Sequence, residues 1–238
     1  MTTSSHSTVR KSPRKNNFSL NVGSFEAESQ RKNTGISLRE IEKPKLNIVV
    51  VGHSQLPDHI EEFDGHNVVT LKHPGATLWS LDKELDTLWH LPAHVVILFL
   101  GGNEIIYDTP ANIKAKFREV INRIQEKLKA HVVVTLIEHR DYRQDKNPRR
   151  QANADKYNKV RKYLNKYLTE SARAGKYRTV NITASNWNER RPDNIHFTRE
   201  GKTQLVNKWR ETIKKYTEEI YNKLKRASDE SSCVVQDN

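Results

Sequence analysis

The sequence has little of what marks a secreted or membrane-spanning protein. Its 238 residues include a single cysteine, Cys233, so no intramolecular disulfide can form and a reducing compartment is expected. Residues 1–6 have no apolar segment of the signal-peptide kind, and no apolar run is long enough to cross a bilayer. We therefore expect a soluble intracellular protein, in the cytoplasm or the nucleus.

Acidic residues are also fewer than basic ones. The 41 lysines and arginines against 29 aspartates and glutamates give a formal net charge of +12 at pH 7. Such an excess attracts polyanions, including nucleic acid and anionic lipid surfaces. Because net charge also serves solubility, it makes nucleic acid an alternative partner and not the expected one.

Both ends of the chain have the composition of disordered tails. Residues 1–44 are rich in Ser, Asn, Lys and Arg and show no apolar period. A basic cluster lies within them, at Arg10, Lys11, Arg14 and Lys15. It is either a solvated stretch or a contact for nucleic acid or nuclear import. Residues 227–238 are a second predicted tail, which leaves one domain at 45–226.

Five short apolar runs alternate with amphipathic segments inside that domain. The runs are rich in β-branched residues and too short for buried helices. They lie at residues 46–52, 67–72, 94–101, 131–137 and 178–182. Strands that alternate with helices predict βαβ units, and therefore an α/β domain with a parallel sheet.

Helix signals occupy the segments between the runs. Thr109 and Pro110 form a cap and a first helical position, and apolar residues then recur on one face from Ile113 to Leu128. Thr198 is the predicted cap of a final long helix, whose apolar face extends from Leu205 to Leu224.

A third helix, marked by Tyr157, Leu164 and Leu168, is crowded with exposed lysines and follows Arg149 and Arg150. The simpler interpretation is a solvated helix face whose lysines cover apolar stems. The alternative is a patch that contacts phosphates beside the active-site rim, with Arg149 and Arg150 as nucleic-acid-binding candidates.

Residues capable of chemistry follow three of the predicted strands. Ser54 follows the first strand, Gly75 the second and Asn103 the third. The carboxyl ends of parallel strands are where an open α/β sheet builds its site. Asp193 and His196 lie near the other end of the domain, three residues apart. A serine with a histidine base and an orienting aspartate is a catalytic triad.

This order of blocks resembles the SGNH hydrolase superfamily, also called GDSL-type esterases, from about Leu46 to Thr198. The resemblance implies a three-layer α/β/α flavodoxin-like fold with a parallel five-stranded sheet. It also implies that Ser54 is the nucleophile, His196 the base and Asp193 its partner. The implied oxyanion hole consists of the backbone N–H groups of Ser54 and Gly75 and the side-chain amide of Asn103. Neither a metal nor a cofactor is implied.

The sequence departs from the family pattern at two positions. The usual Gly-Asp-Ser reads Gly-His-Ser at His53, and the usual Gly-x-Asn-Asp ends in Glu104. The imidazole of His53 is expected to alter the hydrogen bonding of the nucleophile turn. The other histidines lack a recognisable zinc spacing, and His59, His66 and His139 are expected at the surface or at strand ends.

The function expected from this pattern is cleavage of carboxylic esters, acetyl or acyl, through an acyl-serine intermediate. The partner would be an ester-bearing small molecule, a lipid or an acylated substrate. The alternative is a weak or inactive SGNH-fold module that binds RNA, because the basic tail and the Gly-His-Ser variant are similar to domains associated with some retrotransposons. An α/β-hydrolase elbow is excluded, because Leu56 stands where Gly-x-Ser-x-Gly needs its second glycine.

Overall fold

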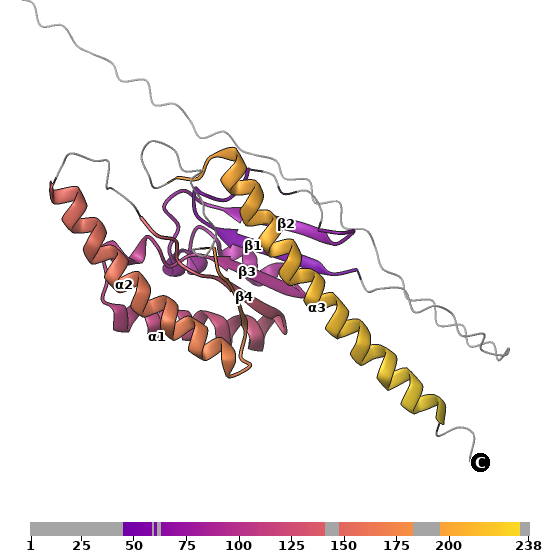
Figure 1. Ribbon diagram of the computed structural model, residues 1–238. Helices are drawn as coiled ribbons and strands as arrows, with labels where there is room; N and C mark the ends of the chain where they lie inside the picture. Colours follow the sequence, from indigo (N-terminus) through magenta and orange to yellow (C-terminus); the bar gives the residue numbers. More distant parts are fainter. Residues whose placement is uncertain (1–44, 59, 61–62, 141–147, 183–195, 234–238) are drawn as a thin grey trace, which may run out of the picture. The chain divides into compact units, whose positions relative to one another are not determined.

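The computed structural model describes residues 45–58, 60, 63–140, 148–182 and 196–233. At its centre is a five-stranded sheet with the order β2-β1-β3-β4-β5, in which all neighbouring strands are parallel (Figure 1). The strands are β1 (Asn47–Gly52), β2 (Asn67–Lys72), β3 (Val95–Phe99), β4 (His131–Thr135) and β5 (Arg178–Val180). The α/β class, the parallel sheet and the positions of its strands are thus confirmed.

Helices cover both faces of the sheet. The α-helices are α1 (Pro110–Arg123), α2 (Pro148–Arg173) and α3 (Arg199–Cys233). Shorter turns are η1 (Leu78–Asp82), η2 (Asp86–His90), η3 (Glu104–Ile106) and the π-helical η4 (Ile124–Leu128). Helices α1 and α2 lie on one side of the sheet and α3 on the other (Figure 1), which is the three-layer arrangement that the sequence predicts.

The alternation of side chains along β1 builds two cores. Val49 and Val51 belong to the core beneath α1 and α2, whereas Ile48 and Val50 belong to the core beneath α3. Neighbouring residues of a strand point to opposite faces. All of β3 is buried, as expected for a central strand of a sheet covered on both faces.

The predicted helix caps are confirmed. Asn112 N–H donates to Thr109 Oγ1 at 3.2 Å, and Gly201 N–H donates to Thr198 Oγ1 at 3.2 Å. Helix α3 continues to Cys233, seven residues past the domain end that the sequence predicts at residue 226. Residues 227–233 contain neither glycine nor proline to stop a helix.

Candidate active site

Ser54 lies in a tight turn directly after β1. Its side chain is half-buried, and Leu56 N–H donates to the His53 carbonyl at 3.0 Å to close the turn. The strand must end in glycine at this point, because a Cβ on Gly52 would lie 2.9 Å from the Phe99 carbonyl oxygen. The close approach of β1 and β3 therefore fixes where the chain turns and where the hydroxyl stands.

Gly75 lies in the turn that follows β2. Ala76 N–H donates to the His73 carbonyl at 3.1 Å, Pro74 takes the second position and Gly75 has φ +75°, which is the pattern of a type II turn. In such a turn the closing hydrogen bond uses the N–H of the fourth residue. The N–H of Gly75 is therefore not the group that closes the turn.

Asn103, which follows β3, contacts the turn after β2 that holds Gly75. Its amide nitrogen donates to the Ala76 carbonyl at 2.9 Å, so the side chain lies against the turn that holds Gly75. An amide nitrogen carries two hydrogens, and the second remains for another acceptor. The structure thus brings together two of the three oxyanion donors that the sequence predicts.

Glu104 makes a second contact between the segment after β3 and the segment after β2. Its buried carboxylate accepts the N–H of Leu78, the first residue of η1. Burial raises the pKa of this carboxyl from its ordinary 4.5 to about 7, although backbone N–H groups, that of Leu78 foremost, oppose the rise. The sequence thus has glutamate where the family usually has aspartate, and this acidic group joins the segment after β3 to the segment after β2.

His53 modifies the nucleophile turn as the sequence predicts. Its Nδ1 accepts the N–H of Gln55 at 3.4 Å, and its side chain is almost fully buried. Burial lowers the pKa of His53, opposed by Glu138 and assisted by Arg140 and His196. The imidazole is consequently neutral and serves as an acceptor within the turn.

An aromatic stack connects the nucleophile turn to the segment of the histidine. The His53 ring lies 4.6 Å from Phe99, and Phe99 lies 6.4 Å from Phe197 in a stacked arrangement. His53 precedes Ser54, whereas Phe197 follows His196. One buried ring at the end of β3 therefore positions the neighbours of both the serine and the histidine.

His196 is half-buried just before α3 and lies near enough to His53 to help lower the pKa of that ring. The first turns of α3 reach the nucleophile turn as well, because Lys202 Nζ donates to the Leu56 carbonyl at 3.3 Å. Asp193 lies outside the described residues. The structure thus brings the segments of Ser54 and His196 to one region, and the role of Asp193 stays a prediction.

A buried polar cluster beneath the turn went unnoticed in the sequence. Gln55 Nε2 donates to Glu138 Oε1 at 2.8 Å, and both side chains are buried. The guanidinium of Arg140 lies 4.2 Å from the centre of the Tyr157 ring. Glu138 and Arg140 follow β4 at the same sheet edge, so a strand-end search like the one that found Ser54 would have marked them.

Of the predicted nucleic-acid residues, the structure describes the backbone of two. Arg149 and Arg150 fall within the first turn of α2, and the basic cluster of residues 10–15 lies outside the described residues. In the part of the chain that the structure describes, no group of His, Cys, Asp or Glu is gathered as for a metal ion, and no helix is long and apolar enough to span a membrane.

A parallel α/β sheet with serine, glycine and asparagine after β1, β2 and β3, and a histidine after β5, defines an SGNH-type hydrolase fold. The chain belongs to the GDSL-like lipase/acylhydrolase family, whose model matches residues 50–203. None of the curated proteins matches it.

Solved structures with the same fold include several hydrolases. The lipase/acylhydrolase from Enterococcus faecalis is 19% identical, with a TM-score of 0.51 and coverage of 72% of this chain and 96% of that one. Esterase EstA from Pseudoalteromonas sp. is 14% identical, with a TM-score of 0.53 and coverage of 72% and 98%. A candidate SGNH hydrolase from Slackia heliotrinireducens is 13% identical, with a TM-score of 0.57 and coverage of 71% and 100%. At these identities the likeness shows the fold alone.

Proposed function

We propose that this protein hydrolyses carboxylic esters through an acyl intermediate on Ser54. The observation that carries the proposal is the convergence of Ser54, Gly75 and Asn103 at one sheet edge. Asn103 donates to the carbonyl next to Gly75, and His196 lies near enough to Ser54's neighbour His53 to act on its charge. Family membership supports the same reaction class.

In the proposed reaction His196 takes the proton of the Ser54 hydroxyl while its oxygen attacks the ester carbonyl. The N–H groups of Ser54 and Gly75 and the amide of Asn103 stabilise the negative oxygen. The carbon–oxygen bond to the alcohol then breaks, and the alcohol leaves with the proton held by His196. Water, activated by the same imidazole, releases the acid and restores Ser54. Asp193 is the proposed partner of the imidazolium.

Exposed apolar side chains beside the donors favour a substrate with an apolar acyl part. Ile106 is 57% exposed and Tyr107 is 83% exposed, only a few residues after Asn103. Trp79, in η1 beyond Gly75, is also exposed. Large apolar side chains left in water next to a site contribute affinity when a ligand covers them.

A covalent probe tests the proposal directly. Ser54 should attack the phosphorus of a fluorophosphonate and expel fluoride, and mass spectrometry should map the adduct to the peptide with Ser54. EstA, the neighbour from Pseudoalteromonas, is inhibited by monoethylphosphonate, which supports this choice of probe.

We expect Ser54→Ala to lose both the adduct and the turnover of p-nitrophenyl acetate, by at least 10³-fold. Thr77→Val is the matched control, because it removes a hydroxyl from a neighbouring turn. Labelling that persists in Ser54→Ala, or maps elsewhere, would refute the assignment of the nucleophile.

A further inference from the structure

The side chain of Gln55 connects the nucleophile turn to the segment after β4. Gln55 follows Ser54 directly, and its Nε2 donates to Glu138 Oε1 at 2.8 Å. Gln55 and Glu138 are each only 2% exposed. Strand β3 lies between β1 and β4 in the sheet. Because neighbouring strands lie about 4.8 Å apart, the two long side chains together span roughly 10 Å past the end of β3.

Two local hydrogen bonds fix the shape of the nucleophile turn. Leu56 N–H donates to the His53 carbonyl at 3.0 Å, and Gln55 N–H donates to His53 Nδ1 at 3.4 Å. The His53 carbonyl belongs to the same planar peptide unit as the N–H of Ser54. The bond from Leu56 therefore sets the direction of the Ser54 N–H within the turn. The bond from Gln55 to Glu138 adds a contact between the turn and another segment of the sheet edge.

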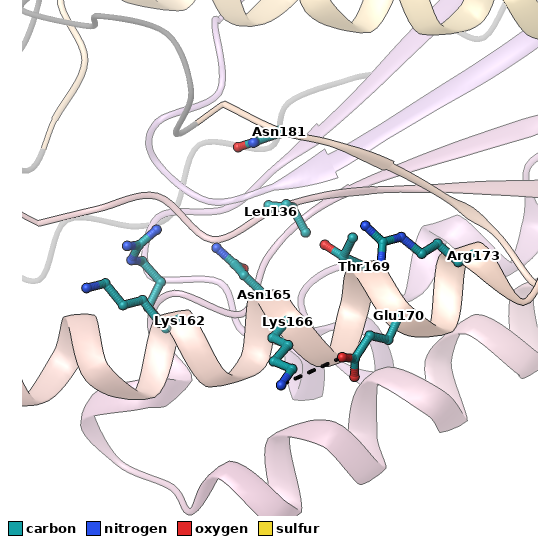
Figure 2. Close-up of a pocket in the computed structure, with 9 residues that line it drawn as sticks. Leu136, Lys162, Asn165, Lys166, Thr169, Glu170, Arg173 and Asn181 are labelled. Carbon is teal, nitrogen blue, oxygen red and sulfur yellow. Dashed lines mark ion pairs between the residues drawn. The ribbon is translucent and has the colours of Figure 1, made fainter.

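Glu138 belongs to a segment that α2 holds at two points. Asn165 accepts the N–H of Ile137 and donates to the carbonyl of the same residue, both at 2.9 Å, and Figure 2 shows its side chain pointing from α2 towards the segment after β4. Asn158 accepts the N–H of Arg140 at 3.2 Å and donates to the Arg140 carbonyl at 2.6 Å. Glu138 lies between the two residues that are held in this way. Its carboxylate is therefore a fixed point for the turn.

The same carboxylate lies close to the residue that precedes Asn103. A Cβ on Gly102 would lie 3.7 Å from Glu138 Oε1 and 3.1 Å from the hydroxyl of Tyr157 in α2. Glycine at this position leaves the space that the carboxylate and the tyrosine occupy. Glu138 is thus close to the segments of two predicted oxyanion donors, Ser54 and Asn103.

Stability alone does not account for a buried carboxylate at this place. A buried charged group loses its hydration, and well-packed apolar side chains of similar volume are often as stable as a buried charged pair or more so. A hydrogen bond adds a fixed distance and direction between two groups. A reaction that depends on donors aimed at one oxygen gains from such fixed geometry, since small misplacements of the reacting groups are costly.

We propose that Glu138 is a positioning residue for the esterase reaction and holds the nucleophile turn in place through Gln55. The inference rests on the proposed function for the reaction that it serves. Its geometric part, the fixing of the turn, does not depend on catalysis. In this role Glu138 neither takes nor gives a proton, and its effect reaches Ser54 through the side chain of Gln55.

Paired methionine substitutions separate positioning from stability. Glu138→Met and Gln55→Met each leave the other side chain buried without its partner, so both should lower the Tm. Gln55→Met/Glu138→Met removes both polar groups at similar volume, and its Tm should recover towards that of the wild type. Its kcat for p-nitrophenyl acetate should nevertheless stay about tenfold to a hundredfold below the wild type, with KM within about twofold. Recovery of kcat together with the Tm would overturn the positioning role.

Two further variants show whether the hydrogen bond itself is what matters. In Glu138→Gln the amide oxygen can still accept from Gln55 Nε2, and we expect kcat within about threefold of the wild type, because a neutral acceptor weakens the bond without removing it. A loss as large as that of Glu138→Met would count against the inference. Thr217→Val removes a buried hydrogen bond to His66 at the opposite edge of the sheet. It should lower the Tm and leave kcat unchanged; a fall in kcat equal to that of the double methionine variant would mean that kcat reports stability alone.

Hydrogen exchange measures the turn without reference to catalysis. By NMR, the amides of Gln55 and Leu56, which both donate within the turn, should exchange about tenfold faster in Gln55→Met/Glu138→Met than in the wild type. In Glu138→Gln they should exchange as in the wild type. Equal exchange in the wild type and the double variant would overturn the inference. If exchange changes as expected but a fluorophosphonate does not label Ser54 in the wild type, the proposed function fails and the positioning of the turn stands.

Discussion

One buried carboxyl in this protein, that of Glu104, is held by backbone hydrogen bonds. Its carboxylate accepts the N–H of Leu78, while burial raises its pKa to about 7. The unfolded chain would release this proton near the ordinary value of 4.5. Between these two pH values the folded state binds the extra proton, so the contribution of Glu104 to stability falls as pH rises through this window.

We predict that Glu104→Gln removes this contribution. The free energy of unfolding of the wild type, minus that of the variant, should decrease by on the order of 3 kcal/mol from pH 4.5 to pH 7.5. Urea denaturation at several pH values, followed by circular dichroism, measures this difference. A difference that stays constant over the range would show that Glu104 keeps an ordinary pKa in the fold.

Gly75 and Gly101 both have positive φ, but the space around the two residues differs. Gly75 has φ +75° and open space around its missing Cβ, whereas a Cβ on Gly101 would lie 2.6 Å from the Phe117 ring. We therefore predict that Gly75→Ala costs about 1–2 kcal/mol of stability, from the left-handed conformation alone. Gly101→Ala should cost more, since strain and overpacking add. Equal losses in thermal denaturation would contradict this interpretation.

Among the helices and strands, the sequence predicts those features that depend on neighbouring residues in the chain. The strands follow from β-branched runs, and α1 and α3 begin where Thr109 and Thr198 supply caps. The pairing of Gln55 with Glu138 could not be found in this way, because it joins residues 83 positions apart. Neither local period nor propensity specifies which buried polar groups meet across a sheet. The serine, glycine and asparagine were found because each follows a strand.

The aromatic stack is the element-scale link between nucleophile and base. We predict that Phe99→Leu lowers kcat for p-nitrophenyl acetate about tenfold to a hundredfold, with KM little changed. Loosening the ring that packs on both His53 and Phe197 misplaces the reacting groups, and small misplacements of this kind are costly. Circular dichroism should show that the secondary structure is retained.

Phe63→Leu is the matched control for this prediction. Phe63 is fully buried in the same core beneath α3 but lies outside the stack. We expect a similar loss of stability, on the order of 1–2 kcal/mol, with kcat unchanged. Equal kcat values in the two variants would mean that Phe99 is a core residue without a positioning role.

For the whole molecule, acid sensitivity depends on histidines inside the fold. His66 was expected at the surface or a strand end; it does precede β2, but it is buried. Its Nδ1 accepts the N–H of Leu46 at 3.2 Å and its Nε2 lies 3.0 Å from Thr217 Oγ1 in α3. This neutral ring connects the start of β1 to the outer helix. Burial lowers the pKa of His66, and also that of His53, below 6.5.

A histidine with a lowered pKa binds its proton less readily in the folded state than in the unfolded chain. The contribution of these two histidines to stability is therefore complete above about pH 6.5 and is lost as pH falls below it. We predict that His66→Asn, which keeps an acceptor for Leu46 N–H, loses less stability than the wild type between pH 7.5 and pH 5.5. His94→Asn is the control, since this exposed ring likewise accepts a backbone N–H, from Asn47. If urea denaturation shows equal acid losses in the wild type and in His66→Asn, the link between α3 and the sheet does not depend on a neutral His66.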